Sequence, residues 1–145
     1  MPRVEREANV VWKGSSARGR GALTGASSGA FAGLPYSEPA RVGTPDGQTS
    51  PEELLAAAHA ACYCMQLSHE LAEAGTPPER LEATATVDFE PGEGVLSSHV
   101  VVRGRVTGID QETFGAAAAS AGESCPISGA LKGNLEITVE ATLDA

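Results

Sequence analysis

The stretch Ser50–Ser68, SPEELLAAAHAACYCMQLS, predicts a long apolar helix at the centre of the chain. Ser50 is a strong capping residue, Pro51 occupies the first helical position, and Glu53 stands three residues after the cap, as in a capping box. We expect the helix to end at about Ala74, because a glycine and two prolines follow closely and are typical stop signals. The chemistry of this helix therefore depends on which face each side chain occupies.

The two cysteines of this helix fall on opposite faces. At about 100° per residue, Cys64 lies about 160° from Cys62, so the two can neither form a disulfide nor bind one metal together. His59 and Cys62 have a spacing suited to metal ligands, but two ligands do not make a site, and we expect no metal. Free cysteine is among the most buried residue types, so core packing also explains both thiols. We expect His59 to be hydrogen-bonded within the core or at the helix edge.

The residues before this helix predict strands followed by a loop. Residues 8–14, ANVVWKG, have strand composition, and residues 18–34 alternate weakly around glycines, as in short strands joined by turns. Residues 35–50, PYSEPARVGTPDGQTS, carry Pro, Gly, Asp and Ser at close intervals. We expect a loop there, and structureless loops of this length are often functional.

The residues after the helix predict a hairpin, a second helix and a closing strand. Residues 81–90 and 96–109 alternate and are rich in Val and Thr, which indicates two strands around the turn PGEGV. Further elements are expected at 110–124 (a helix capped by Asp110), at 125–133 (a helical turn or two, with Cys125 as the cap) and at 134–143 (a strand). This order predicts an α+β fold, a mostly antiparallel sheet covering a helical layer, as a single domain over residues 1–145.

Composition narrows the classes of partner. The chain has 145 residues, 41% of them apolar and 4% aromatic, and a net charge of −9. An acidic chain repels phosphate groups, so we expect neither nucleic acid nor an anionic membrane as a partner. We see no secretion signal and no apolar stretch of about 18 residues. Three cysteines are too few for a disulfide scaffold, which favours a reducing, cytoplasmic location.

Two features favour chemistry over packing for Cys62. Cys125 lies in SCPIS at an expected helix cap, where backbone N–H groups and the helix dipole favour a thiolate. Arg41 lies in the long loop just before the cysteine-bearing helix. Packing alone explains neither of these placements.

These segments resemble the OsmC/Ohr family. The resemblance rests on TSPEELLAAAHAACYCMQLSHELAEAG and the later CPISGAL, with VVWKGSSARGRG and LPYSEPARVG closer to the osmotically inducible (OsmC) branch. It implies a homodimeric thiol peroxidase of the bacterial cytoplasm that reduces organic hydroperoxides in the oxidative stress response. It also implies an intertwined dimer in which mostly antiparallel sheets enclose central helices.

The resemblance implies a role for individual residues. Cys62 matches the peroxidatic cysteine and Cys125 the resolving cysteine, Arg41 the arginine before the helix, and Glu52 the glutamate of the Pro-Glu-Glu motif. Arg18 and Arg20 are alternatives to Arg41, because the loop that carries it varies in length. Cys64 has no role in the family pattern.

The chemistry requires a positive charge that the helix itself does not supply. The attacking group is a thiolate, whereas the pKa of an ordinary cysteine is about 8.5 and burial raises it. Cys62 lies beyond the first turn, where the helix dipole has faded, so an arginine oriented by Glu52 is the expected activator. Glu52 and Cys62 are roughly 15 Å apart along one helix. We therefore expect Glu52 of one chain to approach Cys62 of its partner, with two helices antiparallel across a two-fold axis.

The implied cycle needs no cofactor. Attack on the peroxide converts Cys62 to a sulfenic acid, Cys125 condenses with it to a disulfide, and an external dithiol, either a lipoylated protein or a thioredoxin-like one, reduces the disulfide. Apolar walls would favour alkyl hydroperoxides over hydrogen peroxide. The candidate wall residues are Leu55, Met65, Tyr36 and Phe31, all of which core packing explains equally well.

Two other functions fit parts of the sequence. The first is a non-catalytic redox-sensing or ligand-binding module on the same fold, against which the thiol at a helix cap argues. The second is a cysteine hydrolase with His59 as its base. Mid-helix amides are already hydrogen-bonded and cannot form the oxyanion hole that a hydrolase needs.

Overall fold

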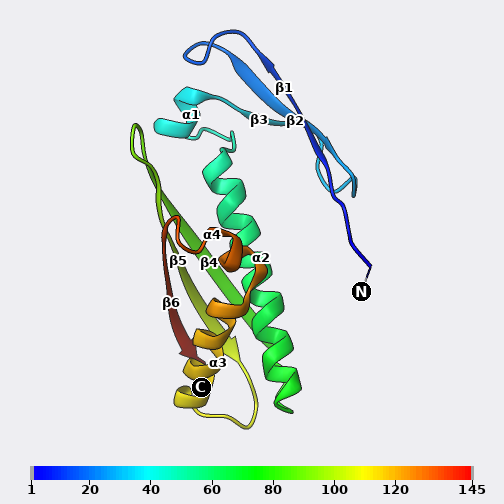
Figure 1. Ribbon diagram of the computed structural model, residues 1–145, viewed down its shortest axis with the longest axis vertical. Coiled ribbons are helices and arrows are strands. Elements are labelled where there is room, and N and C mark those ends of the chain that lie inside the picture. Colours follow the sequence, from blue (N-terminus) through cyan, green and yellow to red (C-terminus); the bar gives the residue numbers. More distant parts are fainter. Residues whose placement is uncertain (1, 145) are drawn as a thin grey trace. The chain divides into compact units, whose positions relative to one another are not determined.

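The computed structural model describes residues 2–144, and the chain divides into two compact units (Figure 1). One unit ends at Leu54 and the other begins at Leu55. The boundary falls within the long helix α2 (Pro51–Glu73). The single domain expected over residues 1–145 stays a prediction.

The first unit contains a three-stranded antiparallel sheet. Its strands, in spatial order, are β1 (Ala8–Lys13), β2 (Arg20–Ala26) and β3 (Leu34–Tyr36). The rings of Trp12 on β1 and Tyr36 on β3 meet across the sheet with their centroids 5.5 Å apart. All six residues of β1 are exposed.

The expectation of a loop over residues 35–50 is wrong at its start. Residue 35 already belongs to β3, and a short helix, α1 (Glu38–Val42), follows. The side chain of Ser37 caps this helix by accepting a hydrogen bond from the backbone N–H of Ala40 at 3.3 Å. A helix of five residues is too short to show a hydrophobic period in the sequence, and the surrounding Pro and Gly residues indicated a loop instead.

The predicted long helix is confirmed, with its end within one residue of the expected one. The hydroxyl of Ser50 accepts a hydrogen bond from the N–H of Glu53 at 3.1 Å, as a capping residue does. At the other end, Gly75 adopts a φ of +86°, a conformation that glycine reaches without steric cost. The buried face of α2 repeats every fourth residue, with His59, Tyr63, Leu67 and Leu71.

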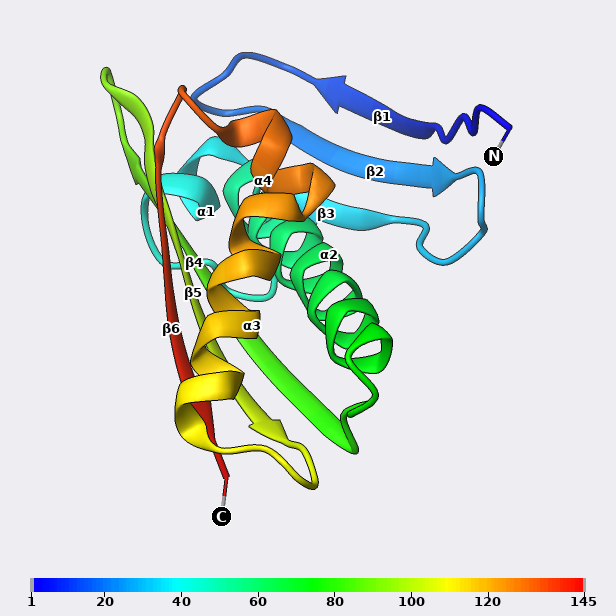
Figure 2. The same cartoon turned by 60° about the horizontal axis from the view of Figure 1, so that its bottom comes forward.

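The second unit contains a mixed sheet rather than a mostly antiparallel one (Figure 2). Its strands are β4 (Arg80–Glu90), β5 (Gly94–Arg105) and β6 (Glu136–Leu143). The predicted hairpin of β4 and β5 is confirmed. β6 pairs with β5 in parallel, because the chain crosses over through α3 (Gln111–Ser124) and α4 (Pro126–Leu131) before it returns to the sheet. A connection that contains two helices is long enough to bring the chain back in the parallel direction, whereas a tight turn can only join antiparallel strands.

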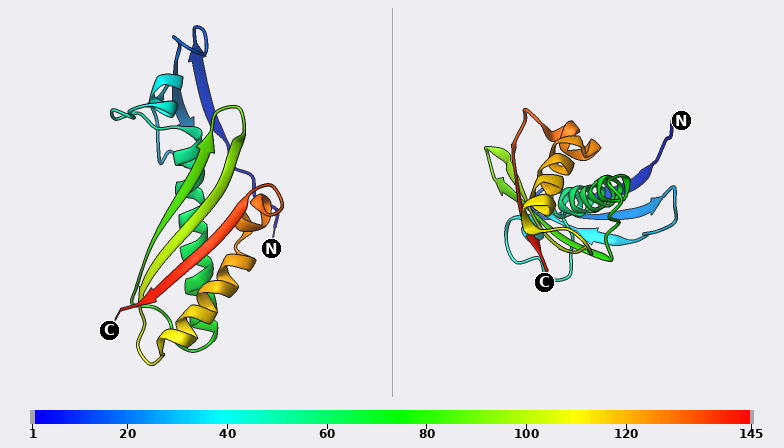
Figure 3. Two further views of the ribbon diagram at one scale, coloured as in Figure 1. Left: turned by 90° about the vertical axis from the view of Figure 1, so that its left-hand side faces the viewer. Right: turned by 90° about the horizontal axis from the view of Figure 1, so that it is seen from below.

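One face of this sheet is covered by α3 and by the part of α2 that follows Leu55 (Figure 3). The buried residues of this core are Tyr63, Leu67, Leu71, Val100, Val102, Val106, Phe114, Ala118, Ala121 and Cys125. The ring of Phe114 packs directly on the backbone of Gly104, where an added Cβ would lie 2.5 Å from a ring atom. Cys125, at the junction of α3 and α4, is thus one of the buried residues of this core.

Candidate active site

Cys62 and Cys125 face each other inside the second unit. Cys62 comes from the middle of α2, and Cys125 ends α3 and caps α4. Their sulfur atoms lie 3.0 Å apart, and both thiols are free. A disulfide bond is about 2.05 Å long, so closing the bond requires a movement of about one ångström. Cys125 is fully buried, whereas Cys62 is only half-buried.

The two thiols have opposite pKa shifts. Burial raises the pKa of Cys62, and the hydrogen bond with Cys125 adds to the increase, although the backbone N–H of Ile127 partly opposes it. Burial also acts to raise the pKa of Cys125, but hydrogen bonds from Cys62 and from the backbone and hydroxyl of Ser128 outweigh it, so the pKa is lowered. Either thiol can donate to the other in the neutral pair. The donors gathered at Cys125 make it the better acceptor and the more acidic of the two.

A buried polar cluster lies beside the thiols. His59 on α2 is fully buried, with Nδ1 2.6 Å from Oγ of Ser98 on β5 and Nε2 2.8 Å from Oγ of Ser128 on α4. The prediction that His59 is hydrogen-bonded within the core is confirmed. Burial lowers the pKa of His59, so the ring is neutral at neutral pH. Neither serine was predicted as part of a site, although Ser128, the serine of the Cys-Pro-Ile-Ser motif, was visible in the sequence.

In the first unit, Arg41 and Glu52 form a two-pronged ion pair. Nε of Arg41 lies 3.0 and 3.1 Å from the two carboxylate oxygens of Glu52, and Nη2 lies 2.6 Å from Oε1. Nη1 also reaches Glu38 at 3.4 Å. Burial acts to raise the pKa of Glu52, but the hydrogen bonds from Arg41 prevail and lower it. The hydrogen bond to Glu52 is in turn the main cause that raises the pKa of Arg41.

The alternative arginines lie elsewhere in the first unit. Arg18 and Arg20 are exposed at the turn that leads into β2, where they line a pocket with Tyr36. Among the three candidate arginines, it is Arg41 that pairs with Glu52. The short helix α1 is what positions Arg41, since the residue lies in its last turn.

The four expected wall residues are spread over the chain. Tyr36 stacks against Trp12, and Phe31 is half-buried in the segment before β3. Leu55 is half-buried on α2, whereas Met65 is 74% exposed on the same helix. Leu55 and Met65 are about 15 Å apart along the helix axis, so one chain alone does not bring them to one small pocket.

Cys64 lies apart from the thiol pair. It is half-buried, and burial raises the pKa of its thiol. It lines an open pocket together with Met65 and His69, beside the start of β4. The backbone N–H of Ala83 acts to lower this pKa, but burial prevails.

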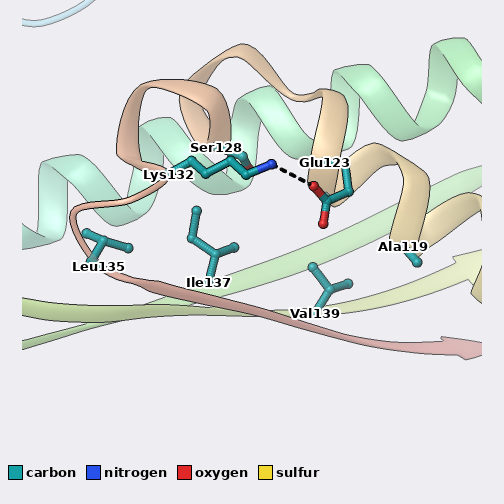
Figure 4. Close-up of a pocket in the computed structure, with 8 residues that line it drawn as sticks. Ala119, Glu123, Ser128, Lys132, Leu135, Ile137 and Val139 are labelled. Carbon is teal, nitrogen blue, oxygen red and sulfur yellow. Dashed lines mark hydrogen bonds and ion pairs between the residues drawn. The ribbon is translucent and has the colours of Figure 1, made fainter.

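A separate pocket of about 350 Å³ lies between the helices α3 and α4 and the start of β6 (Figure 4). Leu135, Ile137 and Val139 from the β6 side form its apolar wall, and Nζ of Lys132 lies 3.3 Å from Oε2 of Glu123 across it. Ser128 also lines this pocket. Ser128, the residue whose hydroxyl contacts His59, thus lies in the wall of this pocket although it is itself almost fully buried.

Residues 2–144 contain neither a group of metal ligands nor a helix that could cross a membrane. Within this range, no three His, Cys, Asp or Glu side chains are grouped so that they could hold a metal ion. None of the described helices has the length and apolarity that crossing a bilayer requires.

The fold and the facing thiols define an α+β protein with a paired-cysteine site. Residues 43–140 match the sequence profile of the family described as OsmC-like protein. The chain belongs to the OsmC-like family, which confirms the resemblance seen in the sequence.

Individual relatives span almost the whole chain. The chain is 35% identical over 140 residues to peroxiredoxin OsmC of Escherichia coli, covering 94% of this chain and 95% of the relative. Among solved structures, an organic hydroperoxide resistance protein OsmC of Legionella pneumophila matches with a TM-score of 0.67 at 25% identity, covering 94% of this chain and 96% of that one. An OsmC-like protein of Mycoplasma pneumoniae has a TM-score of 0.74 at 17% identity, covering 98% and 99%, and supports the fold alone. The chain is thus a homologue of peroxiredoxin OsmC.

Proposed function

We propose that this protein is a thiol peroxidase that reduces organic hydroperoxides, and hydrogen peroxide less efficiently, to alcohols or water. The observation that carries the proposal is the 3.0 Å distance between the free sulfurs of Cys62 and Cys125. Relatives named peroxiredoxin OsmC and organic hydroperoxide resistance protein support it.

Exposure assigns the roles of the two thiols. A hydroperoxide can reach half-buried Cys62 but not fully buried Cys125. The Cys62 thiolate attacks the O–O bond, the sulfur takes the hydroxyl as a sulfenic acid, and the alkoxide leaves and takes up a proton. Cys125 then attacks the sulfenic sulfur, which forms the disulfide and releases water.

Arg41 is the proposed activator of Cys62, with Glu52 as the residue that orients it. The pKa of Cys62 is raised in the single chain, so a nearby cation is needed to form the thiolate at neutral pH. The guanidinium is already held on one edge by Glu52, and its planar fork suits a thiolate and a peroxide oxygen together. A carboxylate alone beside the thiolate would repel it.

A homodimer would bring these parts together. Glu52 and Cys62 are ten residues apart in α2, roughly 15 Å along an ideal helix, so two helices packed antiparallel would place Arg41 and Glu52 of one chain at Cys62 of the other. One face of α2 supports this arrangement, because its exposed side chains are small or apolar at Ala58, Ala61, Met65 and Ala72. The exposed strand β1, with Val10, Val11 and Trp12, offers a second surface for the partner.

Substrate choice and regeneration complete the cycle. At such an interface, Leu55, Met65, Tyr36 and Phe31 would supply apolar contacts that an alkyl group gains and hydrogen peroxide does not. The disulfide would be reduced by an external dithiol, a lipoylated or thioredoxin-like protein of a reducing cytoplasm. The acidic pKa shift of Cys125 makes it the better leaving group in that exchange.

Rapid mixing of the reduced protein with cumene hydroperoxide and with hydrogen peroxide tests this function. We expect faster oxidation by cumene hydroperoxide, a Cys62–Cys125 disulfide by mass spectrometry, and turnover when a dihydrolipoyl compound is supplied. Cys62→Ser should abolish oxidation, Cys125→Ser should leave a trappable sulfenic acid, and Cys64→Ser is the matched control that should behave as wild type. A Cys62→Ser protein that still consumes hydroperoxide would exclude the assignment. Oxidation without turnover by any dithiol would instead favour redox sensing.

A further inference from the structure

We propose that Ser128 and His59 form a buried proton relay for Cys125, which removes the thiol proton as Cys125 attacks oxidised Cys62. Ser128 contacts the reacting sulfur, and His59, which acts through Ser128, is the positioning residue at the end of the relay. This inference rests on the proposed peroxidase cycle and concerns its second chemical step.

The relay follows from a continuous chain of contacts. The hydroxyl of Ser128 is among the donors that lower the pKa of Cys125, and it lies 2.8 Å from Nε2 of His59. Nδ1 of His59 lies 2.6 Å from the hydroxyl of Ser98. The three elements that meet here, α2, β5 and α4, are far apart in the sequence but belong to the same compact unit.

Both ring nitrogens of His59 face a hydroxyl, and a hydroxyl can either donate or accept. With neutral His59, Nδ1 donates to Ser98 and Nε2 accepts from Ser128, whose oxygen accepts from the Cys125 thiol. After the transfer, Ser128 donates to the thiolate and both ring nitrogens donate. Every state therefore keeps its hydrogen bonds, whereas a carbonyl partner would fix one tautomer.

The residues of the proposed relay are buried, so the thiol proton of Cys125 needs a protein group to accept it. Cys125 and His59 are both 0% exposed and Ser128 is 2% exposed, so water does not collect the thiol proton directly. The groups that face His59 are the hydroxyls of Ser98 and Ser128, and burial is the cause of its pKa shift, with no carboxylate or ammonium group contributing. His59 is thus a neutral base that holds the proton briefly.

The step balances as follows. The electron pair of the Cys125 S–H bond stays on sulfur as its proton passes to Ser128, while the hydroxyl proton of Ser128 passes to Nε2 of His59. This electron pair on the Cys125 sulfur forms the bond to the Cys62 sulfur. The S–O bond of the sulfenic acid breaks, and its electron pair leaves with the hydroxide. The hydroxide gains one proton, His59 gives one up, and the products are a disulfide and water.

A purely structural cluster is the rival explanation. In that case the hydroxyls only fasten α2, β5 and α4 together, and their loss lowers stability without changing the pH dependence of any step. The two explanations differ in the rate of sulfenic acid decay, in its pH profile and in its solvent isotope effect.

The test is a single-turnover experiment on the whole protein. Reduced protein is mixed with one equivalent of cumene hydroperoxide, and samples are quenched with dimedone and an alkylating agent and analysed by mass spectrometry. For Ser128→Ala and His59→Gln we expect Cys62 oxidation within about 2-fold of wild type and disulfide formation slowed about 100-fold, the size of a general-base effect. Ser128→Thr keeps the hydroxyl and should restore the rate. Ser124→Ala is the control, because Ser124 is an exposed serine next to Cys125 whose hydroxyl bonds Glu70 rather than His59.

The wild-type protein provides a second test that needs no variant. Disulfide formation should slow at acid pH, as the pH falls toward the lowered pKa of His59, and should show a solvent isotope effect from two moving protons. The relay is overturned if Ser128→Ala forms the disulfide at the wild-type rate, or if wild-type resolution shows neither the acid limb nor an isotope effect. A protein that forms no sulfenic acid at Cys62 contradicts the peroxidase proposal itself, which separates the two failures.

Discussion

Nη2 of Arg41 and Oε1 of Glu52 lie 2.6 Å apart, with Nε of the same guanidinium bound to both oxygens of the carboxylate. The contact joins the last turn of one helix to the first turn of the next. Because Glu52 binds Nε and Nη2 and Glu38 binds Nη1, the orientation of the guanidinium is set by the fold rather than by the substrate.

Arg41→Lys should therefore be damaging although it keeps the charge. A lysine has no planar fork, so it cannot pair with Glu52 on one edge and present donors on the other. We expect the second-order rate of Cys62 oxidation by cumene hydroperoxide to fall about 100-fold, the size of effect seen when an oriented donor is removed. Arg18→Lys, made in an exposed arginine of the same unit, is the matched control and should retain the wild-type rate. The reverse ranking would move the activating role to Arg18.

A mixing experiment tests whether each site draws on two chains. Cys62→Ser and Arg41→Ala are each expected to be inactive alone. If Arg41 acts on the Cys62 of its partner, a mixed dimer regains one intact site of two, and equal mixing and reassembly should restore about one quarter of the wild-type rate. If Arg41 acts within its own chain, mixing restores nothing. Sedimentation of the mixture confirms that dimers are present.

The Glu52 carboxylate predicts acid sensitivity of folding. The pKa of Glu52 is lowered in the folded chain, whereas its value in the unfolded chain is about 4.3. The stabilisation by the ionised carboxylate is therefore complete above the unfolded pKa, and it is lost as the pH falls through the folded pKa. Urea unfolding of wild type and Glu52→Gln between pH 3 and 7 should show curves that differ at pH 7 by about 1 kcal/mol and converge at the acid end. A constant difference across this range would show that the carboxylate charge is not what stabilises the contact.

Gly104→Ala should destabilise the second unit. A Cβ at this position would lie 2.5 Å from the ring of Phe114, which is fully buried and has nowhere to move. We expect a loss of about 1 to 3 kcal/mol in the free energy of unfolding, as for other overpacked cores. Gly25→Ala is the matched control, because a Cβ there meets no atom within 4 Å. Equal stabilities of the two variants would contradict the close packing of Phe114 on β5.

Local signals predicted the helices α2 and α3 and their caps well, whereas the five-residue helix α1 was missed. Asp110 accepts a hydrogen bond from the N–H of Thr113 at 2.8 Å, and Ser50 caps α2 in the same way, so these helix starts were readable from a few adjacent residues. The contacts of His59 could not be read in this way, because they join residues 39 and 69 positions apart. The parallel return of β6 is equally non-local, since alternation reveals a strand but not the direction of its neighbour.

The parallel pairing of β6 with β5 also has a consequence for biosynthesis. Cys125 lies in the crossover that ends in β6, a strand that is synthesised after both Cys62 and Cys125, and Gly122 of α3 packs against Val139 of β6. Both thiols have therefore been synthesised before the element that closes the crossover exists, and long-range strand pairing is a slow step of folding. A chain that is stalled or truncated before β6 thus carries the two cysteines without the strand that closes the crossover around them.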